Sequence, residues 1–125
     1  MRKLAALLCL IFTVLLFSVE VSWSAYFRKG LTAYDSGDYA TALREWTPLA
    51  EQGYADAQYN LGGMYTTGDG VPVNNVRAYM WWSLAKAQGY ENAADNLDIV
   101  KNEMTPAQIA KAQELATKMW KKINN

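Results

Sequence analysis

A repeat with an offset of 36 residues constrains the fold of this chain more than any other feature of its sequence. The stretch Gly53 to Gly63 reads GYADAQYNLGG, and a shorter copy, GYENAADNL, begins at Gly89. At this offset small residues align with small ones, large with large, and glycines with glycines. The aligned pairs are Ala42 with Ala78, Trp46 with Trp82, Gly53 with Gly89, Tyr54 with Tyr90, Ala57 with Ala93, and Leu61 with Leu97. One supersecondary unit used more than once explains this pattern.

The spacing of apolar residues predicts that each unit is a helical hairpin. Ala57, Leu61 and Tyr65 recur at intervals of four residues, which is typical of one face of a helix. The segment GDGVP at Gly68 to Pro72 combines strong stop signals and is expected to end that helix near Thr67. Asn74 can cap the next helix through its side-chain oxygen, and Gly89 can end it.

Three such hairpins account for the chain after its first two dozen residues. The first is expected over residues 25–53 around the turn DSGD, the second over 54–89, and the third over 90–123. In the third hairpin, Thr105, Pro106 and Gln108 have the pattern of a capping box at a helix start. The predicted fold is therefore all-α, an α/α array of about three helical hairpins.

The repeated positions are expected to be structural. Gly62 and Gly63 are predicted where two helices cross closely, because glycine inside a helix otherwise costs ~1 kcal/mol. Tyr79 to Trp82 are four consecutive bulky residues that cannot share one helix face, so at least one is expected to be exposed or packed on a neighbouring repeat. The complete structural set is Ala42, Trp46, Gly53, Ala57, Leu61, Gly62, Tyr65, Gly68, Gly70, Ala78, Trp82, Gly89, Ala93 and Leu97.

Residues 1–24 have the layout of a secretory signal peptide. A basic start precedes an apolar run over residues 4–17, and Ser22 and Ser24 are small residues before an expected cut at Ala25. An uncleaved anchor is the alternative, although the run is shorter than the ~20 residues that span a bilayer. Cleavage would leave a domain of residues 25–125, periplasmic or secreted, without stable membrane insertion. It would also remove Cys9, so the mature chain could form no internal disulfide.

Composition argues against several classes of function. The chain has 12 basic and 12 acidic residues and no histidine, and removing Arg2, Lys3 and Glu20 leaves 10 basic and 11 acidic. No nucleic-acid partner is therefore predicted. Without histidine or a retained cysteine, no metal site or cofactor is predicted either.

Two further patterns bear on catalysis. Of the two acidic pairs spaced one turn apart, Asp35 with Asp38 is expected to cap a helix, and Asp95 with Asp98 is expected on a solvated face. Ser83 and Lys86 form the pattern S-x-x-K of penicillin-binding enzymes, but the S-D-N and K-T-G elements of that chemistry do not occur. The chain is therefore predicted not to be an enzyme. A peptidoglycan- or β-lactam-directed hydrolase using Ser83 and Lys86 remains the alternative.

Residues 55–89, ADAQYNLGGMYTTGDGVPVNNVRAYMWWSLAKAQG, resemble a Sel1-like repeat, a relative of the tetratricopeptide repeat. The matching motifs are Ala-x-x-x-Leu-Gly-x-x-Tyr at 57–65 and Gly-x-Gly-Val at 68–71. The first hairpin lacks that longer loop and is closer to a tetratricopeptide pair, and the third resembles the closing helices of such arrays. The resemblance implies a right-handed superhelix that acts as a non-catalytic scaffold or adaptor of the cell envelope.

The resemblance also implies where a partner would bind, on a concave surface lined by the first helix of each hairpin. The implied ligand-facing positions are Phe27, Leu31 and Tyr34 in the first hairpin, Asp56, Tyr59, Gly63 and Thr66 in the second, and Asn92, Asp95 and Ile99 in the third. Tyr59 and Phe27 would offer aromatic area beside carboxylates to a peptide with a basic or apolar side chain. The sequence leaves open the partner's identity and whether the chain forms a homo-oligomer.

Overall fold

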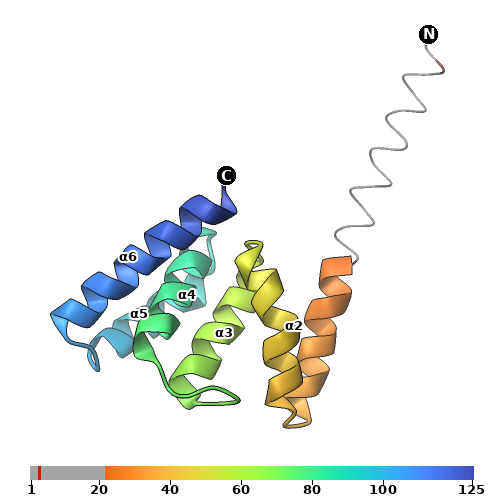
Figure 1. Ribbon diagram of the computed structural model, residues 1–125, viewed down its shortest axis with the longest axis horizontal. Helices are drawn as coiled ribbons and strands as arrows, with labels where there is room; N and C mark the ends of the chain where they lie inside the picture. The colour runs from red at the N-terminus through yellow and green to blue at the C-terminus, as the bar shows by residue number, and fades with distance from the viewer. Residues whose placement is uncertain (1–2, 4–21) are drawn as a thin grey trace.

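The computed structural model describes Lys3 and residues 22–125. The predicted signal peptide, including Cys9, lies outside the described residues except for Lys3 and residues 22–24. Residues 22–125 form six helical segments and no strand. These are an N-terminal helix over residues 22–35, α2 (Tyr39–Glu51), α3 (Ala55–Thr67), α4 (Asn75–Ala87), α5 (Glu91–Lys101) and α6 (Pro106–Ile123). They follow one another as three hairpins (Figure 1), which confirms the predicted all-α repeat array.

The predicted helix ends are confirmed at their capping residues. Helix α3 ends at Thr67, and Gly68 follows it with a left-handed φ of 79°. The side chain of Asn74 accepts a hydrogen bond of 3.0 Å from the backbone N–H of Arg77, the start of α4. The capping box of α6 is complete, because Thr105 and Gln108 each accept a backbone N–H from the other.

Gly53 and Gly89 end the second helices of the first two hairpins with the same backbone motif. Their φ angles are 98° and 91°, a region that side chains disfavour. After α2, the N–H of Tyr54 donates to the carbonyl of Leu49, and after α4 the N–H of Tyr90 donates to that of Ala85. Both turns are Schellman motifs, so the aligned glycines perform the same task in each hairpin.

A tryptophan packed on a glycine joins the two helices of the first hairpin and of the second. A Cβ at Gly30 would overlap the indole of Trp46, and one at Gly62 would overlap that of Trp82. Each indole N–H donates to a backbone carbonyl three residues before the glycine, at 3.0 Å in both cases: Phe27 for Trp46 and Tyr59 for Trp82. We call each arrangement a Trp–Gly lock. The predicted packing role of Gly62 agrees with this geometry.

Gly63 does not have the close-packing role that its neighbour suggested. A Cβ at Gly63 would meet no atom within 4 Å. The helix crossing needs a missing side chain only on the face that meets Trp82, and Gly63 lies one residue further round the helix. The prediction of a close crossing at Gly63 was therefore wrong.

Helix α4 is the centre of the fold because neighbours cover it on several sides. It packs against α3, α5 and α6. Met80 and Trp81 belong to a core shared with α2 and α3, whereas Tyr79 and Trp82 belong to a core shared with α5 and α6. All four side chains are at most 8% exposed. Of the two outcomes expected for these residues, packing against neighbouring repeats is the one observed, and none of the four is exposed.

Polar side chains link successive hairpins. Gln58, fully buried on α3, donates to the carbonyl of Ala50 at 3.1 Å and accepts from Gln88 at 2.8 Å. In the loop after α3, Asp69 accepts a 2.7 Å hydrogen bond from the hydroxyl of Tyr34 on the N-terminal helix and one from Thr67. The neighbouring Gly70 has a φ of 74°, and a Cβ there would lie 2.8 Å from that of Tyr39. The Gly-x-Gly-Val loop of the second hairpin thus packs against the first hairpin and is hydrogen-bonded to it.

We expect Tyr34 to ionise at an unusually high pH because of its contact with Asp69 in this loop. The hydrogen bond to Asp69, together with burial and the negative charge of that carboxylate, raises the pKa of Tyr34 from its ordinary 10.0 to about 12. Since the folded pKa is the raised one, the protonated phenol stabilises the fold below pH 10, and this stabilisation is lost as the pH rises toward 12. Absorbance titration at alkaline pH, compared with Tyr34→Phe, isolates this phenol. Asp69→Asn should return its pKa toward 10, and a Tyr34 titration that Asp69→Asn leaves unchanged contradicts the assignment.

Helix α6 reaches beyond its own hairpin. Leu115, Ala116 and Met119 pack against the core of the first two hairpins, and Ala112 and Ile109 pack in the core next to α5. At its end, Ile123 lies against Gly53, where a Cβ would be 2.9 Å from the isoleucine methyl group. Helix α6 therefore touches the junction between the first and second hairpins.

Candidate binding groove

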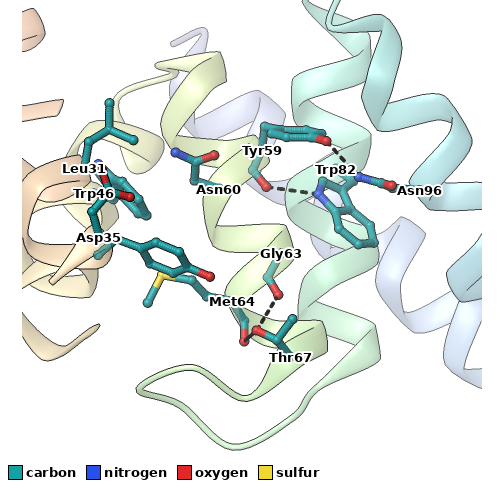
Figure 2. Close-up of a pocket in the computed structure, with 11 residues that line it drawn as sticks. Leu31, Asp35, Trp46, Tyr59, Asn60, Gly63, Met64, Thr67, Trp82 and Asn96 are labelled. Carbon is teal, nitrogen blue, oxygen red and sulfur yellow. Dashed lines mark hydrogen bonds between the residues drawn. The ribbon is translucent and has the colours of Figure 1, made fainter. Parts of the chain in front are cut away.

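A groove of about 330 Å³ lies between the N-terminal helix and α3, with α5 at its far end (Figure 2). The N-terminal helix and α3 are the first helices of their hairpins, and α5 is the first helix of the third. The groove is thus on the surface where the resemblance placed a partner. Its lining residues are Leu31, Tyr34, Asp35, Trp46, Tyr59, Asn60, Gly63, Met64, Thr67, Trp82 and Asn96.

The aromatic walls of the groove are set by the two Trp–Gly locks. Trp46 and Trp82 both line it, and their indole N–H groups are already bound to backbone carbonyls. Tyr34 lies stacked on Trp46 at a centroid distance of 5.8 Å, and Tyr59 lies stacked on Tyr90 at 4.6 Å. Trp46 and Trp82 are only 1% and 6% exposed. The aromatic surface of the groove therefore comes mainly from the half-buried Tyr34 and Tyr59, which Trp46 and Tyr90 support by stacking.

Three side chains supply polar groups with capacity for a ligand. Asn96 donates to the hydroxyl of Tyr59 at 3.2 Å, which leaves its side-chain carbonyl available. Asn60 forms no hydrogen bond with the other residues drawn in Figure 2. Asp35 is exposed, and none of the ion pairs among the described residues involves it. Amides and a carboxylate thus border an aromatic groove, as is usual for sites that orient a ligand by a few polar groups.

The groove contains four of the ten positions implied as ligand-facing. Leu31, Tyr34, Tyr59 and Gly63 line it. The absence of a side chain at Gly63 keeps the floor open, since nothing lies within 4 Å of its Cβ position. Tyr59 is half-buried rather than free on the surface, because it is held between Tyr90 and Asn96.

Three of the other positions are occupied by contacts within the chain. Phe27 stacks on Trp46 and meets Tyr54 edge to face. Asp56 lies close enough to Tyr54 and Tyr90 that, after burial, its charge is the next cause raising the pKa of both phenols. Thr66 donates its hydroxyl to the carbonyl of Gly63 at 2.8 Å.

The remaining three positions, Asn92, Asp95 and Ile99, are exposed on α5 and do not line the groove. Ile99 is 64% exposed. The third hairpin contributes Asn96 to the groove instead. Asn96 is the α5 residue that reaches α3, where its side chain donates to the hydroxyl of Tyr59.

The sequence contained a signal for two lining residues that reasoning from it missed. Asn60 and Asn96 are separated by the same 36 residues that relate Trp46 to Trp82, so the repeat itself could have paired them. The sequence predicts that Asp35 and Asp38 cap a helix, and it does not predict Asp35 in the groove. Asp38 performs that role, accepting from the N–H of Thr41 at 3.2 Å. Hydrogen bonding from the side chain of Thr41, and then from its backbone, lowers the pKa of Asp38.

The Ser83 and Lys86 pair does not form a nucleophile and base. The hydroxyl of Ser83 donates to the carbonyl of Tyr79 in its own helix at 2.7 Å. Lys86 is exposed, and no hydrogen bond between the two side chains is present in this part of α4. The serine thus has the ordinary bond of a helical serine, and nothing in the geometry supports the hydrolase alternative.

No group of three or more acidic, cysteine or histidine side chains is arranged to hold a metal ion within the described part of the chain. Among the helices that the structure describes, none is both long and apolar enough to cross a membrane.

The fold and groove define a helical-repeat protein of the tetratricopeptide-like class, in which paired helices present a surface to a partner. Residues 55–90 match the model of the Sel1 repeat family. The matched segment covers α3, the Gly-x-Gly-Val loop and α4. This segment of the chain is thus similar to a Sel1 repeat, and proteins with such repeats generally mediate protein–protein contacts.

Three relatives share this similarity over part of their length. An exopolysaccharide production negative regulator of Rhizobium meliloti (strain 1021) is 31% identical over 80 residues, which are 64% of this chain and 30% of the relative. A protein of the same description from Rhizobium leguminosarum bv. viciae is 28% identical over 62% of the chain and 29% of its own length. The alginate biosynthesis protein AlgK of Pseudomonas aeruginosa is 33% identical over 53% of the chain and 14% of its own length. The chain spans less than a third of each.

Proposed function

We propose that the chain is a non-catalytic scaffold or adaptor of the bacterial cell envelope, and that it holds an extended segment of a partner protein in the groove. The observation that carries this proposal is the groove itself, which is lined from three successive first helices. Its volume of about 330 Å³ suits one or two side chains of a peptide rather than a folded element. Aromatic anchors with a few polar groups are what peptide and protein interfaces commonly use.

An envelope location is supported by the signal-like layout of residues 1–24 and by the relatives. Their names concern exopolysaccharide production and alginate biosynthesis. We therefore propose export to the periplasm or beyond, and a partner among proteins that regulate or build an extracellular polysaccharide. Self-association through the same surface remains an outcome to be tested.

Gly63→Leu is the sharpest test, because it fills the groove without removing a contact. Leucine is a good helix former, and its Cβ would enter open space. Tyr59→Ala is less suitable, since it would also remove the stacking on Tyr90. For Gly63→Leu, we expect the yield of partner crosslinked from a photoreactive residue at position 60 to fall at least tenfold. The melting temperature should not fall, because leucine favours the helix more than glycine does.

The control is Ala110→Leu, which places the same side chain on an exposed position of α6. It should retain full crosslinking. Mass spectrometry of the crosslinked species then separates a foreign partner from a second copy of the chain. Equal crosslinking by wild type and Gly63→Leu, with both folded, would exclude the groove as the binding surface.

A further inference from the structure

The charge of the groove is the feature that the proposed function does not use. Among the residues that the structure describes, Asp35 is the only charged one that lines it, and no lysine or arginine does. A second carboxylate, Asp69, lies just behind, bound to the hydroxyl of Tyr34. Lys29, on the same helix as Asp35, is paired with Glu45 of α2 at 3.0 Å. The groove is therefore negative, and an anionic ligand would meet repulsion there.

The aromatic walls, like the carboxylate of Asp35, favour a ligand with a positive charge. A cation near the face of a tyrosine or tryptophan ring is attracted by the ring's electron density. Tyr34 lies one residue from Asp35 and lines the groove with it. Because both indole N–H groups are bound to backbone carbonyls, the tryptophans offer no donor to an anionic or carbonyl group. The half-buried rings of Tyr34 and Tyr59 are therefore the aromatic surface that a cation can meet.

The amides extend this recognition to a peptide. The free carbonyl of the Asn96 side chain and the side chain of Asn60 lie on neighbouring first helices, at positions related by the 36-residue offset. Side-chain amides can both accept from and donate to hydrogen-bonding groups. Figure 2 shows Asn60 between Asp35 on one side and Asn96 on the other. One ligand can therefore meet the amides and the carboxylate together.

We infer that the groove takes a basic side chain, arginine or lysine, of an extended segment in the partner protein. The aliphatic stem lies against the aromatic walls, and the charged end lies at Asp35. This inference rests on the proposed function, and it specifies which partners can bind. Segments that carry an acidic residue at the same position are rejected.

The test uses the full-length chain and a soluble library of random hexapeptides, with enrichment read at each position. Wild type should select arginine or lysine at one position. Asp35→Asn should lower the affinity for a selected peptide about fivefold, near the upper limit for an exposed ion pair, and should abolish the preference for a basic residue. Asp35→Lys should select aspartate or glutamate at that position instead.

Asp98→Asn is the matched control, since Asp98 is exposed on α5 and does not line the groove. It should keep the preference of wild type. If peptides are selected, and Gly63→Leu abolishes the selection, but no basic preference appears or Asp35→Asn leaves it intact, the basic anchor is wrong while the groove remains the binding site. If no peptide binds, or binding survives Gly63→Leu, the proposed function fails as well. Binding of glucosamine oligomers in place of basic peptides would overturn the inference in favour of a cationic saccharide.

Discussion

Trp82→Ala should lower the free energy of unfolding by about 3 to 5 kcal/mol, the usual scale for emptying a buried aromatic site. The indole is 6% exposed, fills the space over Gly62 and donates to the carbonyl of Tyr59. Truncation therefore leaves a cavity between α3 and α4 and removes the hydrogen bond that the indole donates to the carbonyl of Tyr59. Because small domains are stabilised by only ~5–15 kcal/mol, much of the fold's stability would be lost.

Urea unfolding followed by circular dichroism measures this loss. Trp120→Ala is the control, because Trp120 is 39% exposed on α6 and its removal should cost much less. A Trp82→Ala midpoint close to that of wild type would mean that the lock between α3 and α4 contributes little to stability.

Gly62→Ala should be destabilising, whereas Gly63→Ala, one residue later, should not be. A methyl group at position 62 overlaps the indole of Trp82, and overpacking of this kind typically costs about 1 to 3 kcal/mol. At position 63 the same methyl group enters open space, and the better helix propensity of alanine should stabilise the fold by up to about 1 kcal/mol. The two substitutions share composition, helix and neighbourhood, so their difference measures the lock alone.

The measurement is again chemical denaturation, with the slope checked for an unchanged unfolding transition. Equal effects of the two substitutions would show that α3 and α4 can separate to admit a methyl group at no cost. Gly30→Ala should behave like Gly62→Ala, since the indole of Trp46 occupies the same place over Gly30.

The helices could be predicted from the sequence because their signals are local. Asn74, Gly89 and the Thr105 capping box each satisfy backbone groups within a few residues. A short stretch of sequence is therefore enough to predict each of these helix ends. The offset of 36 then placed Trp46 and Trp82 in equivalent positions.

The groove was predicted less well because its shape depends on how helices pack. No local pattern distinguishes Gly62 from Gly63; only the position of Trp82 on α4 decides which of them is crowded. Phe27 and Asp56 are at positions that match a ligand-binding surface in register. In the structure, however, they contact neighbouring aromatic side chains of the same chain. The 36-residue offset could not predict the Trp–Gly lock of the first hairpin. Trp46 precedes Trp82 by 36 residues, but Gly30 precedes Gly62 by only 32, so the two glycines do not align.

The contact of α6 with Gly53 has a consequence for how this array can change in length. In an ideal solenoid each unit touches only its neighbours, so a unit can be added with little effect on the others. Here Ile123 of the third hairpin lies at the junction of the first two. An additional copy of residues 54–89 inserted after Gly89 would carry α6 away from that junction and uncover Gly53. Adding a hairpin by duplication at this place is therefore expected to cost stability. The number of hairpins is linked to the length of α6, because α6 must be long enough to reach Gly53.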